Sequence, residues 1–228
     1  VEGPVADAAP SPVTSYERAS RLSYLIWSSM PDDALFAAAE ADALRTPEQI
    51  LRHVERMLAD PRARQGLLGF FDQWLTLGRV EVAQKDPATY PAWNPMLAAA
   101  MRKETQTFVT ELVLRGDGTL KSLLTSPKSH LDEALARLYG VPGVTGSTSR
   151  EAALDPTRRA GLLTQGSFLA AAARPRQSSP VARGVWVLEH MLCMSPPPPP
   201  ANVAAEFPEP VPGVSTRERL EEHRKNPT

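Results

Sequence analysis

The chain has 228 residues, a formal net charge of −1 and 42% hydrophobic residues. A chain of this length buries roughly 70% of its unfolded surface, so we expect a sizeable core. The near-neutral charge argues against a nucleic-acid partner, and no apolar run reaches the ~18 residues that a membrane span requires.

Helix-capping signals mark the expected elements of the first third. Residues 1–14 contain three prolines and are expected to form an extended leader. Thr14 and Glu17 have the spacing of a capping box, and Thr46 and Gln49 repeat it around a proline. Amphipathic helices are therefore predicted over 16–29 and 32–43, and after Pro47 and Pro61.

Capping and glycine signals continue beyond a loop predicted at 80–93. The next helices are predicted over 95–115, 120–125 and 131–139, within 157–173, and over 180–193 and 215–224. The longest of them would open at Asn94 and Pro95 and end at Gly116. The helix at 131–139 would be capped by Ser129, and the helix at 180–193 would be opened by Ser179 and Pro180. Residues 140–155 are rich in Gly, Ser and Thr and lack periodicity, so we place a division between two modules there.

These patterns predict an all-α fold, because no segment shows the sustained alternation of a strand. A multi-helix domain at 15–150 would be followed by a smaller helical module at 151–228. Residues 196–200 are five consecutive prolines and are expected to form a polyproline II rod, followed by an extended tail. We expect the core to bury five aromatic side chains: Trp27, Phe70, Phe71, Trp74 and Phe108.

Side chains that could carry chemistry are few. None of the four histidines has a second ligand at a metal-binding spacing. Ser167 lacks the flanking glycines of a nucleophile elbow. Glu104 and Glu111 share a helix face and are interpreted as solvated charges. We predict no catalytic, cofactor-binding or metal-binding residue.

The single cysteine, Cys193, excludes an internal disulfide and a cysteine-rich zinc site. It is predicted to be a reduced thiol in a monomer. Arg183 and Trp186 lie about one helical turn apart. We interpret the pair as a surface arginine over a half-buried indole, with a contact for a partner as the alternative. The proline run is interpreted as a rigid spacer, with docking to an aromatic groove as the alternative.

Several long blocks occur in a fixed order along the chain. They are Arg21–Asp33, Met57–Arg64, Phe71–Leu75, Met101–Thr105, Gly161–Gln165, Ser179–Trp186, the proline run and Asn202–Val203. Together they resemble the planctomycete-type cytochrome c domain proteins, which are large exported multidomain chains also common in myxobacteria. The resemblance covers residues 15–228, nearly the whole sequence.

This resemblance implies that 15–150 is a domain of unassigned function and that 151–228 is the front of a second domain. In the family the second domain continues into a Cys-x-x-Cys-His haem motif, so the chain is interpreted as a haem-free fragment. The expected cofactor of the full-length parent is c-type haem, and the expected partner is the cytochrome c module of that parent. Export implies a periplasmic or extracellular location. Arg217, Arg219 and His223 are the candidate contacts with the haem module.

The leading functional hypothesis is a helical scaffold that positions a haem module for electron transfer. One alternative is an extracellular or periplasmic enzyme domain that acts on a polymer with haem as its redox partner. Another is a protein–protein interaction module. Convergent carboxylates in a cleft would favour the enzyme, whereas a featureless helical surface would favour the scaffold. We do not expect the fragment itself to be an enzyme.

Overall fold

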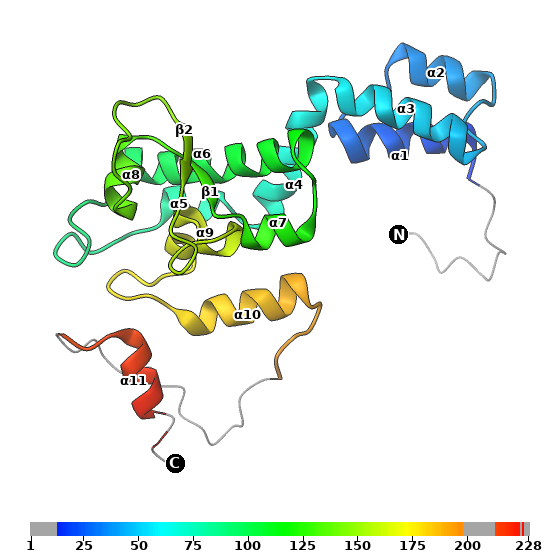
Figure 1. The fold of residues 1–228 in the computed structure, drawn as a ribbon. Coiled ribbons are helices and arrows are strands. Elements are labelled where there is room, and N and C mark those ends of the chain that lie inside the picture. Colours follow the sequence, from blue (N-terminus) through cyan, green and yellow to red (C-terminus); the bar gives the residue numbers. More distant parts are fainter. Residues whose placement is uncertain (1–12, 198–212, 224, 226–228) are drawn as a thin grey trace. The chain divides into compact units, whose positions relative to one another are not determined.

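A computed structural model of the chain describes residues 13–197, 213–223 and 225. The chain forms two compact units, Val1–Phe70 and Phe71–Thr228. In the described residues it is predominantly helical, with eleven α-helices and one small two-stranded sheet, which confirms the predicted fold class (Figure 1). None of these helices is long and apolar enough to cross a membrane. Most of the expected leader, proline run and tail lies outside the described residues, and the division predicted at 140–155 stays a prediction.

The first unit is built from helices that begin where the capping signals predict. They are α1 (Ser15–Trp27), α2 (Asp33–Glu40), α3 (Pro47–Ala59) and the start of α4 (Arg62–Trp74). Both predicted capping boxes are present: Thr14 accepts from the Glu17 amide, and Thr46 accepts from the Gln49 amide. Local sequence therefore fixes the starts of α1 and α3.

The core of the first unit centres on Trp27, which is buried as predicted. Its indole Nε1 donates to the carbonyl oxygen of Met57 at 2.9 Å, and this bond joins α1 to the end of α3. The guanidinium of Arg62 covers the same ring, with Cζ 3.5 Å from the ring centroid. Met57 and Leu35 complete the buried centre.

The second unit begins with the end of α4 and is arranged around the long helix α6 (Pro95–Thr110). The short helix α5 (Gly78–Val82) occupies the start of the predicted loop at 80–93. After α6 the chain continues as a π-helical turn, Glu111–Arg115. Gly116 follows it. A glycine is needed at this position because a Cβ there would lie 2.7 Å from the Leu112 carbonyl oxygen.

A small antiparallel sheet replaces part of the structure predicted around residues 128–155. Strand β1 (Lys128–Leu131) pairs with β2 (Arg150–Ala153), and Ser129 lies opposite Ala152. The predicted capping role of Ser129 is therefore wrong. Asp132 caps α8 (Glu133–Tyr139) instead. Strands of four residues are too short to show a convincing alternation in the sequence.

Shorter helices complete the second unit. They are α7 (Leu120–Thr125), the 3₁₀ turn Leu162–Thr164, α9 (Gly166–Ala171), α10 (Pro180–Met191) and α11 (Thr216–His223). Ser179 caps α10 as predicted, accepting from the Ala182 amide at 3.3 Å. The helix predicted within 157–173 is divided between the 3₁₀ turn and α9.

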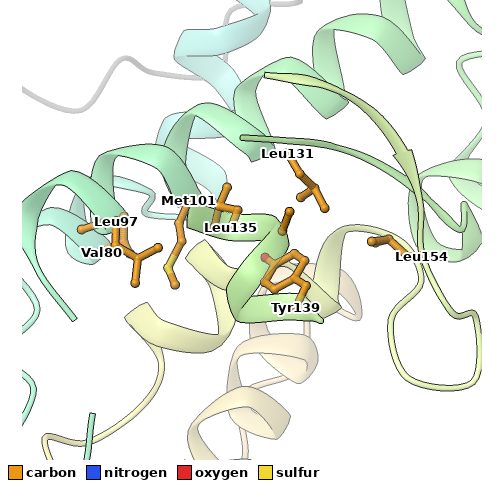
Figure 2. Close-up of a cluster of buried hydrophobic side chains, with 9 residues drawn as sticks. Val80, Leu97, Met101, Leu131, Leu135, Tyr139 and Leu154 are labelled. Carbon is orange, nitrogen blue, oxygen red and sulfur yellow. The ribbon is translucent and has the colours of Figure 1, made fainter. Parts of the chain in front are cut away.

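Figure 2 shows the hydrophobic cluster of the second unit, in which Leu97 and Met101 from α6 pack with Leu135 and Tyr139 from α8. Phe71 and Phe108 are buried as predicted, and Trp74 is half-buried. Phe70 is 58% exposed, so its predicted burial is wrong. Neighbouring residues on a helix point about 100° apart, and Phe71 takes the inward position.

Candidate functional site

The three candidate haem-module contacts lie on α11, and the two whose side chains are described have different surroundings. Arg217 is exposed and pairs with Glu221 at 2.9 Å. Arg219 is buried, and its Nη2 donates to Gln177 Oε1 at 2.9 Å and to Thr216 Oγ1 at 3.2 Å. The backbone of His223 ends α11, and its side chain lies outside the described part. The contact with a haem module stays a prediction for all three.

Arg183 and Trp186, the predicted partner contact, lie in two different environments. Arg183 lines the cavity described below. The Trp186 ring stands edge-on to Phe168 at 4.9 Å between centroids and stacks on His190 at 4.8 Å. Trp186 therefore packs within its own unit, and the partner contact of this pair stays a prediction.

A buried carboxyl group, Glu104, joins four elements of the second unit. It projects from α6 and is 1% exposed. Its Oε1 accepts from the Ser129 hydroxyl of β1 at 2.7 Å, and its Oε2 accepts from the Tyr139 hydroxyl of α8 at 2.6 Å. The Tyr139 oxygen accepts in turn from the Gly166 amide of α9 at 2.7 Å. This chain of hydrogen bonds explains why Ser129 lies in a strand and not in a helix cap.

The environment of Glu104 raises its pKa to about 7. Burial is the main cause, because it disfavours the charged form, while the Tyr139 and Ser129 hydrogen bonds and the charge of Arg159 act in the opposite direction. Burial and the neighbouring carboxyl also raise the pKa of Tyr139. Glu104 can therefore hold or release a proton near neutral pH inside a hydrogen-bonded network.

Gly166 has to be a glycine at this point. A Cβ on it would lie 2.8 Å from the Tyr139 hydroxyl oxygen and 2.9 Å from Met101 Cγ. Those distances are below van der Waals contact, so the close approach of α9 to Tyr139 depends on the missing side chain.

A cavity of about 460 Å³ opens beside Tyr139. Its apolar walls include Leu97, Met101 and Tyr139, which Figure 2 shows, together with Trp93 and Leu169. Three cationic side chains also line it: Lys85, Arg159 and Arg183. Among the described residues that line it there is no aspartate or glutamate. A cavity of this size can hold a small molecule.

Two of the cations are held in place by the surrounding backbone. Lys85 Nζ donates to the carbonyl oxygens of Ala170 and Ala173, both at 2.9 Å, and burial lowers the pKa of Lys85. Arg159 lies over the Tyr139 ring, with Cζ 3.8 Å from the centroid, and its Nη1 donates to the Thr164 carbonyl oxygen at 2.8 Å.

Among the described residues, no group of three or more His, Cys, Asp or Glu side chains could hold a metal ion. Cys193 is exposed and is a free cysteine. Ser167 is buried, and its hydroxyl lies 2.6 Å from that of Thr105.

Sequence reasoning missed the two features that define this site. It interpreted Glu104 as a solvated charge, which is wrong, whereas Glu111 is partly exposed and pairs with Arg115. A signal did exist, since Leu97, Met101, Glu104 and Phe108 follow the spacing of a buried helix face. Lys85 and Arg159 lie in irregular segments, where the sequence has no periodic pattern from which their spatial neighbours could be predicted.

Two family models match successive regions of the chain. Residues 13–141 match the PSD4 family model, described as a protein of unknown function (DUF1592). Residues 159–228 match the PSCyt3 model, described as a protein of unknown function (DUF1588). The two names hint at a planctomycete cytochrome c-type family. No curated protein and no solved structure matches the chain.

Proposed function

The chain belongs to the DUF1592 family, and on this premise we propose that it is a haem-free helical scaffold of an exported c-type cytochrome protein. In that protein it would position a haem module for electron transfer. The observation that carries the proposal is the pair of consecutive family matches, the second with a cytochrome-related name. The blocks from Arg21 to Val203 that resemble this family lie within the two matched regions and agree with them.

The haem of this proposal belongs to another module of the parent, because the residues of this chain do not suit covalent attachment. A c-type haem is attached through two thiols in a Cys-x-x-Cys-His motif. The chain has one thiol, Cys193, and Met194 and Ser195 follow it. No step of electron transfer is therefore assigned to a residue of this chain.

Helix α11 is the part that we propose to meet the haem module. Its buried Arg219 donates to Gln177, in the segment that leads into α10, so α11 is tied to another segment of its unit. At its first turn, Ser215 and Glu218 form reciprocal hydrogen bonds. In this proposal Arg219 fixes the helix, while the exposed Arg217, with His223, makes the contact.

The proposed location follows from the proposed cofactor. Covalent c-type haem is attached outside the cytoplasm, so a parent that carries it would be periplasmic or extracellular. The proposed partner is the cytochrome module of the same parent chain.

The enzyme alternative receives less support from the geometry. Hydrolysis of a glycan polymer commonly uses two carboxyl groups that face one cleft. In the part of the chain that the structure describes, the cavity beside Tyr139 is lined by three cations and by no carboxylate. Glu104 is buried outside this lining, and its two oxygens accept hydrogen bonds from Ser129 and Tyr139.

The test is to produce the full-length parent with a c-type haem maturation system and to export it. We expect covalently bound haem, a Soret band and a spectral change on adding dithionite. Residues 1–228, produced in the same way as a control, should be colourless. A parent without covalent haem, or tight haem binding by residues 1–228 alone, would contradict the proposal.

A further inference from the structure

The cavity beside Tyr139 concentrates positive charge in a chain whose formal net charge is −1. Lys85, Arg159 and Arg183 all line it, and none of them makes an ion pair with a carboxylate among the described residues. Among the described residues the buried carboxyl group is Glu104, which interacts with the charge of Arg159, and burial raises its pKa to about 7 and so reduces its negative charge near neutral pH. The charge of these cations is therefore only partly compensated within the protein.

The positions of two cations are fixed before any ligand arrives. Lys85 is held by three backbone carbonyl groups and so acts on a ligand through its charge, and Arg159 is held between the Tyr139 ring and the Thr164 carbonyl group. Ordering a long cationic side chain opposes binding, so groups that are already ordered bind an anion at lower entropic cost. Partial burial also strengthens their attraction to an anion.

The walls specify the rest of the ligand. Trp93 and Tyr139 line the cavity with aromatic rings, Arg159 covering one face of the Tyr139 ring, and Met101 and Leu169 add apolar side chains. Such walls favour a flat, apolar body, while the guanidinium groups suit the two oxygens of a carboxylate. A compact inorganic ion would leave most of the apolar wall without contact.

We propose that this cavity is a binding site for a small carboxylate with an aromatic or other flat apolar body. The carboxylate lies among Lys85, Arg159 and Arg183, and the body packs against Trp93 and Tyr139. This site is independent of the proposed haem module, and either proposal can fail without the other.

Isothermal titration calorimetry of the 228-residue chain with three probes tests both parts of the proposal. The probes are 2-naphthoate, the neutral 2-naphthylmethanol and acetate. We expect 2-naphthoate to bind at least about tenfold more tightly than either other probe. Equal affinity for the alcohol would refute the role of the cations, and equal affinity for acetate would refute the role of the walls. Failure of 2-naphthoate to bind at millimolar concentration would overturn the proposal.

A matched pair of variants assigns the binding to this cavity. Arg183→Gln removes a half-exposed lining cation and should weaken 2-naphthoate binding about tenfold, as expected for a charge-assisted hydrogen bond. Arg115→Gln removes an exposed arginine outside the cavity and should leave the affinity unchanged. Circular dichroism of both variants checks that the fold is retained. Equal affinities of the two variants would place the binding elsewhere and refute the site.

Discussion

Replacement of Glu104 by glutamine tests the buried network most sharply. Glutamine keeps the size of the side chain but stays neutral at every pH. Its amide oxygen can accept from the Tyr139 hydroxyl, and its amide nitrogen can donate to the Ser129 oxygen, since both hydroxyl groups can rotate. Glu104→Gln should therefore fold and should mimic the protonated carboxyl group.

The size of the effect follows from the pKa of Glu104, which moves from 4.5 to about 7 on folding. Between these values the folded state holds a proton that the unfolded state has released, so the free energy of unfolding falls as the pH rises. At about 1.4 kcal/mol for each pKa unit, the loss is about 3 kcal/mol between pH 4.5 and pH 7. Glu104→Gln abolishes this contribution.

Urea denaturation of the wild-type chain and of Glu104→Gln, each at pH 5 and at pH 8, measures it. We expect the wild type to lose about 3 kcal/mol more than the variant between the two pH values. Glu104→Leu is the control for hydrogen bonding, because it leaves the Tyr139 and Ser129 hydroxyl groups without their acceptor. This variant should be destabilised at both pH values. Equal pH dependence in the wild type and Glu104→Gln would refute the account of a raised pKa.

Three further outcomes are expected in the same chain. Gly166→Ala should lower the free energy of unfolding by about 1–3 kcal/mol through overpacking. Gly69→Ala is the control and should not lower it, because a Cβ at Gly69 meets no atom within 4 Å. Urea midpoints that fall equally in the two variants would contradict this prediction. Trp27→Phe should cost about 1 kcal/mol, because the Met57 carbonyl group loses the indole donor and keeps only the Asp60 amide, and unchanged thermal stability would count against it. Cys193 should be reduced, so non-reducing electrophoresis should show a monomer and not a quantitative covalent dimer.

Local sequence predicted those parts of the fold that local interactions determine. The capping residues Thr14, Thr46, Asn94 and Ser179 are all in place, because a helix cap needs only residues three positions apart. Ser129 carries the same type of signal, but pairing with β2 and the hydrogen bond to Glu104 override it. Such long-range contacts are not visible in a window of a few residues.

The candidate site was beyond prediction for the same reason. Lys85 and Arg159 are 74 positions apart in the sequence, and their common position depends on α9, whose backbone holds Lys85, and on α8, whose Tyr139 holds Arg159. Glu104 was the predictable exception, because its position on the buried face of α6 could be inferred from the apolar residues around it. A general preference for solvated carboxylates obscured that signal.

The central claim is that this scaffold holds a haem module near α11, and paramagnetic relaxation in the full-length parent tests it most directly. A spin label is attached through Glu222→Cys, an exposed position of α11 that keeps Arg217, in a Cys193→Ser background, and its relaxation is measured with ferric haem present. We predict clear relaxation enhancement relative to the same label in residues 1–228 alone, and a smaller enhancement when Gln177→Ala breaks the bond that ties α11 to its unit. A label that relaxes equally in the haem-bearing parent and in residues 1–228 would contradict the account.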